Sequence, residues 1–151
     1  AGVEGSYLIE YKRGELKTLE GVTIEPALDR AGKAELISAF YSYPKIKANL
    51  FLNANTGGHN LRATVRYISK LKDRNHDLDT ATAGVQEAKI KAFWQLDLTY
   101  QAELPGDTTL TLKVDNVFDQ DPSFAYSQFN YDYTSANPLG RVFGVGLRKR
   151  F

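Results

Sequence analysis

Hydrophobic and polar residues alternate along several stretches of this 151-residue sequence. The clearest stretch is 93–104, where Trp94 and Leu96 fall on one face of an extended chain and Gln95 and Asp97 fall on the other. Successive side chains of a β-strand point to opposite sides of its sheet. The pattern therefore predicts a strand with one apolar face and one polar face.

The same alternation predicts about seven strands and an all-β, antiparallel fold. The predicted strands are residues 3–11, 16–24, 46–54, 61–71, 93–104, 108–116 and 141–151. The alternation is weakest in 16–24, because Glu20 falls among its apolar positions. A tilted strand needs roughly 9–11 residues to cross a bilayer, and most of these stretches have that length.

The predicted connections alternate between short and long. Short turns are expected at 12–15, 55–60 and 105–107, and long polar connections at 26–45, 72–91 and 117–140. Short turns at one end and long loops at the other are typical of outer-membrane barrels, with the long loops outside. A soluble β-sandwich also has alternating strands, although its loop lengths need not alternate, so it stays open as an alternative.

Charged side chains fall on the polar faces of the predicted strands. They are Lys47, Arg62, Arg66, Asp97, Lys113 and Arg148. A Lys or Arg that faces lipid at the bilayer midplane costs roughly 2–4 kcal/mol. A register slip of one residue would place several charges there at once. We expect these residues, with Arg150, to line a lumen and to pair with each other or with a plug.

Composition excludes several classes of protein. The 19 Lys and Arg nearly balance the 18 Asp and Glu, which argues against a nucleic-acid binder that depends on counterion release. No apolar run approaches the roughly 20 residues of a membrane-spanning helix. The lack of Cys excludes disulfides and thiolate metal sites. Since Met is also lacking and the sequence begins at Ala1, we expect a chain that was processed or cut from something longer.

The last predicted strand ends on an aromatic residue. Its apolar face carries Phe143, Val145, Leu147 and Phe151, and its other face carries glycines and arginines. This strand resembles the assembly signal of outer-membrane β-barrels, which the barrel-assembly machinery reads. Lys149 departs from the pattern, but a long side chain near the end of a strand can reach the interface.

The residues before that strand resemble the closing part of a TonB-dependent outer-membrane receptor. A strand runs into Asn116, Phe118 and Asp119, a long loop follows, and Gly140 and Arg141 precede the last strand. The resemblance is closer over residues 58–151 than over 1–57.

This resemblance implies that residues 1–151 are the C-terminal part of a receptor barrel, with the last seven strands of a 22-stranded wall. The plug domain would be absent. The parent would lie in the outer membrane of a Gram-negative bacterium and bind a scarce ligand, such as a ferric siderophore or cobalamin. The TonB complex would drive uptake through an N-terminal segment.

The implied partners are outer-membrane lipid, the plug, the remaining strands, the TonB complex, the barrel-assembly machinery and an unidentified small molecule, with no nucleic acid. The implied protein is not an enzyme and has no cofactor. Two alternatives remain open, a plugless outer-membrane channel and a soluble β-sandwich binding module. A channel would share the wall pattern but would lack the closing motif.

Candidate chemistry is sparse. His59 falls in a short turn and His76 in a long loop, and opposite ends of a barrel cannot share a metal ion or a base. No Ser-His-acid set is recognisable, so we predict no catalytic, cofactor or metal site. Residues 73–79 space four oxygen side chains by two, but Leu78 and Gly84 stand where a calcium loop needs Gly and Glu. A solvated loop is the favoured interpretation.

Aromatic residues gather at 124–133 in the last long loop. Loops of the resembled family can close over ligand, but packing within the loop or an aromatic girdle is the favoured interpretation. Tyr67, Trp94 and Tyr100 are interpreted as interface anchors.

Overall fold

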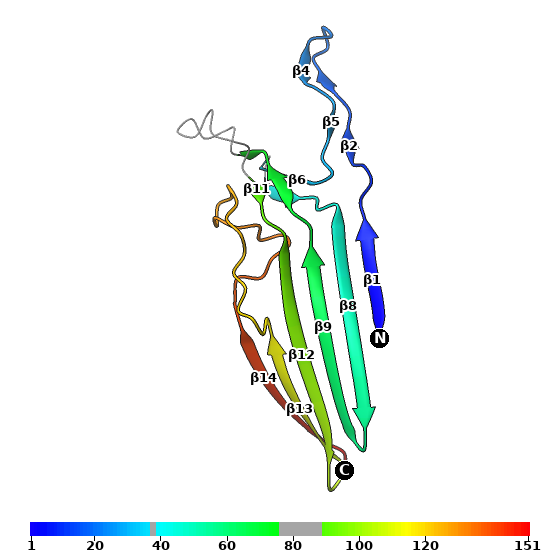
Figure 1. Ribbon diagram of the computed structural model, residues 1–151. Coiled ribbons are helices and arrows are strands. Elements are labelled where there is room, and N and C mark those ends of the chain that lie inside the picture. Colours follow the sequence, from blue (N-terminus) through cyan, green and yellow to red (C-terminus); the bar gives the residue numbers. More distant parts are fainter. Residues whose placement is uncertain (37–38, 76–88) are drawn as a thin grey trace.

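The computed structural model describes residues 1–36, 39–75 and 89–151. Its main element is one long antiparallel sheet with the order β1-β8-β9-β12-β13-β14 (Figure 1). The strands are β1 (Gly2–Tyr7), β8 (Ile46–Thr56), β9 (His59–Ile68), β12 (Phe93–Leu104), β13 (Thr108–Asp115) and β14 (Val142–Lys149). The predicted all-β, antiparallel fold is therefore confirmed for the described residues.

Smaller sheets lie at the end of the long strands from which the long connections leave (Figure 1). A four-stranded sheet has the order β11-β10-β6-β7, in which β10 and β6 run parallel. Its strands are β6 (Lys33–Leu36), β7 (Phe40–Ser42), β10 (Leu71–Asp73) and β11 (Lys89–Ile90). Two further pairs join β2 (Lys12–Arg13) to β5 (Leu28–Asp29) and β3 (Leu16–Lys17) to β4 (Thr23–Glu25).

The register of the long sheet keeps its two faces chemically distinct. Leu98 lies opposite Ala63 on β9 and opposite Val114 on β13. The next residue, Thr99, lies opposite Arg62 and Lys113. Because the side-chain period of a strand is two, this register places aliphatic and aromatic rows on one face and mostly polar rows on the other. We name these the apolar face and the polar face.

The apolar face is open across the long sheet. Leu50 is 48% exposed, Leu112 40% and Leu147 70%. Within the described residues, no second sheet covers these side chains. The buried apolar cluster lies instead among the long connections, and consists of Ala34, Phe40, Leu71, Ile90 and Ala125, with Tyr133 packed against it.

The prediction for residues 16–24 is wrong. This stretch does not join the long sheet, because β3 and β4 pair with each other as a separate hairpin. Thr18 and Val22 close the turn, with the Thr18 amide donating to the Val22 carbonyl at 2.8 Å. The hairpin folds the chain back after two residues of strand, so the alternation never extends far enough to span the sheet.

This hairpin changes the strand count and one direction. β1 pairs directly with β8, with Val3 opposite Leu50, so the described long sheet has six strands where about seven were predicted. Residues 12–15 are not a turn at the short-turn end, since they lie within the long connection between β1 and β8 (Figure 1). β1 consequently runs opposite to the predicted direction.

The other predicted strands are present with shifted ends. β9 stops at Ile68, and Leu71 begins the separate strand β10. β14 begins at Val142 and ends at Lys149, so Phe151 lies beyond it. The described residues contain no helix with the length and apolarity needed to cross a membrane.

Candidate functional site

The residues of the closing motif meet in one corner between β13 and β14. β13 ends at Asp115, and Asn116 follows with a positive φ of 54°. The Asn116 side chain accepts a hydrogen bond from the Gln120 amide at 2.9 Å and donates to the Gln120 carbonyl at 3.0 Å. Asn tolerates this backbone region better than most residues, and its side chain can satisfy nearby backbone groups.

Asp119 connects that turn to the start of β14. Its Oδ1 accepts a hydrogen bond from the Arg141 amide at 2.7 Å. Gly140 lies beside it with φ of 64°, and a Cβ at this position would lie 2.7 Å from the same oxygen. A side chain at position 140 would therefore be strained and would displace the carboxylate. Phe118 packs against Trp94, with ring centroids 5.6 Å apart.

The predicted assembly residues lie on the apolar face of β14. Phe143, Val145 and Leu147 stand opposite Val114, Leu112 and Leu110 of β13 and are mostly exposed. Phe151 is also exposed, and its ring centroid lies 5.5 Å from the Lys149 ammonium. The other side of β14 has no paired strand among the described residues. Recognition of this strand by an assembly machinery stays a prediction.

The polar face carries paired charges. Arg66 Nε lies 2.8 Å from Asp97 Oδ2. Asp97 is only 5% exposed, and its Oδ1 also accepts hydrogen bonds from Gln95 Nε2 at 2.8 Å and from the Asn116 amide at 3.0 Å. This carboxylate therefore ties β9, β12 and the closing corner together. The predicted pairing of charges on this face is confirmed for Arg66 and Asp97.

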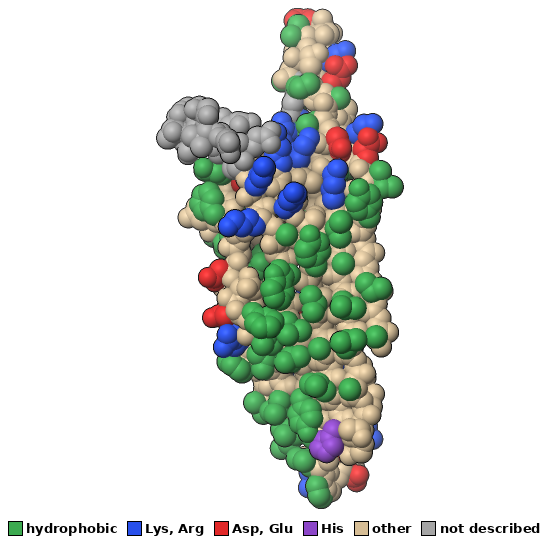
Figure 2. Space-filling view, viewed as in Figure 1, with side chains coloured by type: hydrophobic (Ala, Val, Ile, Leu, Met, Phe, Trp, Pro, Cys, Tyr) green, Lys and Arg blue, Asp and Glu red, His purple; other side chains and the backbone are tan. Residues whose placement is uncertain are grey.

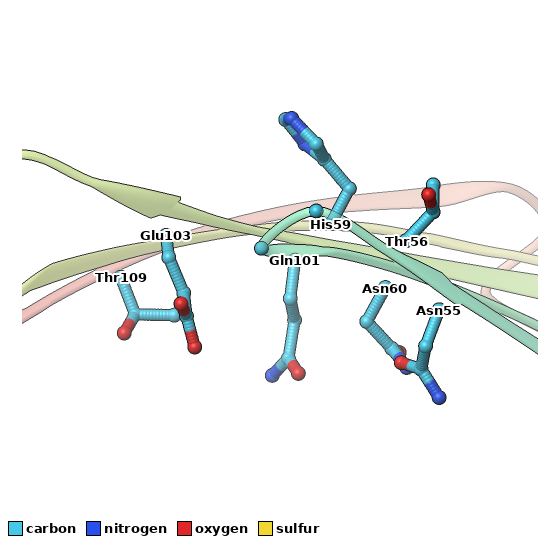
Figure 3. Close-up of a pocket in the computed structure, with 9 residues that line it drawn as sticks. Asn55, Thr56, His59, Asn60, Gln101, Glu103 and Thr109 are labelled. Atoms are coloured by element: carbon cyan, nitrogen blue, oxygen red, sulfur yellow. The ribbon is translucent and has the colours of Figure 1, made fainter.

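A hollow of about 400 Å³ lies on the polar face near the short turns (Figure 3). Figure 3 shows polar side chains that point to the same side of the sheet, from Asn55, Asn60, Gln101, Glu103 and Thr109. His59 points to the opposite side, where its Nδ1 lies 2.7 Å from the Tyr100 hydroxyl. His59 is among the residues that line the hollow, but the groups that point into it in Figure 3 are amides, a carboxylate and a hydroxyl.

The long connections are joined to one another at the loop end. Arg30 Nε lies 2.6 Å from Glu35 Oε1 within the first connection, and both side chains are buried. Glu35 Oε2 also lies 3.5 Å from Arg74 Nη1 of the second connection. The Phe40 amide donates to the Tyr133 hydroxyl at 3.1 Å, which links the first long connection to the last. Asp73 accepts the Asn75 and Tyr126 amides at 3.0 and 2.7 Å. These contacts make the loop end a packed unit.

The aromatic segment at 124–133 packs largely on itself and on the loop core. Phe129 meets Tyr133 edge-on, with ring centroids 5.1 Å apart, and Tyr133 lies 5.5 Å from Phe40. Phe124 and Phe129 remain more than half exposed. The favoured interpretation, packing within the loop, describes Tyr133 well.

The oxygen-rich stretch 73–79 is described only in part. Asp73 is buried and uses its carboxylate oxygens for backbone amides, while residues 76–79, with His76, lie outside the described residues. Across the described ranges, no group of three His, Asp or Glu side chains is arranged to hold a metal ion.

Local contacts shift three pKa values at the loop end. The amides of Tyr11 and Ala31 donate to Asp29 and hold the pKa of its carboxyl below the usual value. A hydrogen bond to Glu10 raises the pKa of Lys12. Burial raises the pKa of the Tyr43 hydroxyl. The lowered pKa of Asp29 stabilises the folded loop at pH values above the ordinary pKa of aspartate. This stabilisation is lost as the pH falls through the lowered pKa.

The comparison with solved structures decides the fold. A mutant of the ferric enterobactin receptor of Pseudomonas aeruginosa, a TonB-dependent receptor, matches with a TM-score of 0.53 and 22% sequence identity. The match covers 80% of this chain and 18% of the receptor chain. The chain has the fold of part of a TonB-dependent receptor barrel. It thus spans less than a fifth of the length of the receptor that it matches.

The resemblance seen in the sequence is therefore confirmed at the level of the fold. No family model and no curated protein matches the sequence. The closing motif in the sequence identified Asn116, Asp119 and Gly140 as notable residues, but it did not predict their contacts. The sequence analysis did not predict the Arg30–Glu35 pair, which needs the chain to fold back within one connection, or the Asp73–Tyr126 contact, which needs two separate loops to meet.

Proposed function

We propose that this chain forms the C-terminal part of the barrel wall of a TonB-dependent receptor in the outer membrane of a Gram-negative bacterium. The observation that carries the proposal is a single-layer antiparallel sheet, apolar and open on one face and polar on the other, with the fold of a receptor barrel. The complete protein would bind a scarce ligand, such as a ferric siderophore or cobalamin, and would not be an enzyme.

The height of the apolar face supports a lipid environment. Its residues on β12 run from Trp94 to Leu104, about 33 Å along the strand at roughly 3.3 Å per residue. At the tilt of roughly 40° found in outer-membrane barrels, this corresponds to a height of about 25 Å. That is the height of the apolar band of such barrels. Trp94 and Tyr67 stand at its loop end and suit the role of interface anchors.

The polar face would look into the lumen. The Arg66–Asp97 pair and the polar hollow near the short turns would then face the plug domain of the complete receptor. The packed loop end would lie outside the cell and form part of the mouth that admits ligand. TonB would act through an N-terminal segment of the complete protein.

The two rival functions differ in what they require of the sheet. A soluble β-sandwich requires a second sheet over the apolar face, whereas Leu147 is 70% exposed. A plugless channel fits the wall equally well, so energy dependence is the property that separates it from a receptor.

Uptake measurements test the proposal. Cells that carry the complete gene should accumulate one member of a panel of labelled ferric catecholates, ferric hydroxamates and cobalamin, and cells with the gene deleted should not. Collapse of the proton-motive force should stop accumulation but leave surface binding. Accumulation that is indifferent to the proton-motive force would instead identify a passive channel, and deletion without effect on the whole panel would refute the receptor.

A further inference from the structure

The β3–β4 hairpin has one polar side and one apolar side. On the polar side, Lys17 Nζ lies 2.6 Å from Glu15 Oε1, and Lys17 stands opposite Thr23 across the hairpin. The apolar residues of both strands alternate with these three along the sequence, so their side chains point to the other side. We name this other side, together with the tip of the turn, the hairpin apolar face, and it is formed by Leu16, Leu19, Val22 and Ile24.

The described residues leave the hairpin apolar face largely uncovered. Leu16, Val22 and Ile24 are each more than half exposed, and Leu19 at the tip is fully exposed. The hairpin lies at the far tip of the loop end, away from its buried cluster (Figure 1). An isolated two-stranded hairpin is at best marginally stable in water and needs a further strand or another packed element. The hairpin therefore needs a cover that the described residues do not supply.

The bilayer is not that cover. Figure 2 shows the apolar side chains of the long sheet as a band, with a belt of Lys and Arg side chains beyond it and the hairpin farther out still. Lys and Arg are costly in the hydrocarbon region and are tolerated near its interfaces, so the belt marks the outer limit of that region. The hairpin lies beyond this limit, where a protein segment must supply the apolar contact.

Neighbouring long connections pack on one another throughout the described part of the loop end. The Arg74 amide of the second connection donates to the Ala34 carbonyl of the first at 3.0 Å. The Tyr126 amide of the third connection donates to the Asp73 carboxylate of the second at 2.7 Å. The hairpin belongs to the first connection and lies on the side of β1 (Figure 1), whose outer edge has no paired strand among the described residues. Its neighbour on that side lies outside this sequence.

We propose that the hairpin apolar face docks on the long connection that precedes β1 by one strand in the complete receptor, which we name the preceding connection. Short and long connections alternate in the proposed wall, so a short turn would join β1 to the strand at its outer edge. That strand would then begin at the loop end, and the preceding connection would emerge beside the hairpin with an apolar segment over Val22 and Ile24. This inference rests on the proposed function, because it needs the larger wall.

Chemical labelling of the complete protein tests whether the hairpin apolar face is covered. The 151 residues contain no cysteine, so a single cysteine can be placed on either side of the hairpin in a complete protein that has no others. On intact cells, Val22→Cys should react with a membrane-impermeant maleimide at least tenfold more slowly than the control Lys17→Cys. Ile24→Cys should be as slow as Val22→Cys, and all three should react equally after unfolding. Heat-dependent gel mobility establishes that each variant is folded.

Photo-crosslinking tests which segment supplies the cover. Leu19→p-benzoylphenylalanine places a photoreactive side chain at the tip of the hairpin apolar face. After irradiation of intact cells, mass spectrometry of the digested protein should find the tip joined to the preceding connection of the same chain.

Several outcomes would overturn the inference. Equally fast labelling on both sides of the hairpin would show a free hairpin. A crosslink within residues 1–151, to a second copy of the chain or to another protein would assign the cover to a different segment. The uptake assay separates this inference from the proposed function. Fast labelling of Val22→Cys with energised uptake intact would refute the docking alone, and the expected crosslink without any energised uptake would refute the receptor alone.

Discussion

At the scale of single residues, the corner between β13 and β14 shows how few atoms connect the residues that follow one strand to those that precede the next. One carboxylate oxygen of Asp119 accepts the Arg141 amide, and Gly140 leaves the space in which that bond forms. Asn116 supplies the positive φ that turns the chain toward them. The corner is therefore built from backbone conformation and one charge-assisted hydrogen bond, more than from apolar packing.

Gly140→Ala should destabilise the folded protein by about 2–3 kcal/mol, because it combines a strained backbone with displacement of the Asp119 carboxylate. Urea unfolding of the complete protein in detergent, followed by circular dichroism, would measure this change. Gly106→Ala is the matched control, since Gly106 also has a positive φ but has open space at its Cβ. It should cost only the backbone term of about 1–2 kcal/mol. Equal losses for the two variants would contradict the role given to the contact.

At the scale of elements, each long strand is defined by which environment its two faces meet. Leu112 and Thr111 are neighbours on β13, but Leu112 stands in a row with Tyr100 and Val145, and Thr111 stands in a row with Gln101 and Gly146. The alternation along the sequence predicted these two faces. The alternation did not exclude residues 16–24 as a wall strand. Whether that stretch joins the long sheet depends on a turn that closes within it.

Leu112→Lys should lower the stability of the complete protein in bilayers by about 2 kcal/mol or more, because it places a charge in lipid. Thr111→Lys adds the same side chain one residue away on the polar face and should cost less than about 1 kcal/mol, as substitutions at solvated positions usually do. Reversible unfolding in lipid vesicles would provide both values. Similar costs at both positions would contradict the assignment of lipid to the apolar face.

At the scale of the whole molecule, two properties matter, the packed loop end and the free edges of the long sheet. The loop end has the buried cluster and the Arg30–Glu35 pair. The long sheet has β1 and β14 at its edges, each with one side unpaired among the described residues. In lipid, each unsatisfied backbone group costs several kcal/mol, so such edges require neighbours.

The 151-residue chain, expressed alone in detergent, should therefore associate through its edges, whereas the complete protein should be monomeric. Size-exclusion chromatography with light scattering would measure both masses. A stable, monodisperse monomer of the isolated chain would show that its edges need no further strands, and the proposed place in a larger wall would fail.

The sequence by itself determined the two-faced strands, their approximate ends and the short turns at 55–60 and 105–107, because a period-two pattern and turn residues act over a few neighbouring positions. Tertiary structure alone decided that β1 pairs with β8, that Asp119 meets Arg141, and that Lys33, Lys72 and Lys89 share one row. These pairings join segments far apart in the chain. Their register is set by packing and hydrogen bonding across the whole sheet, and no local pattern encodes it.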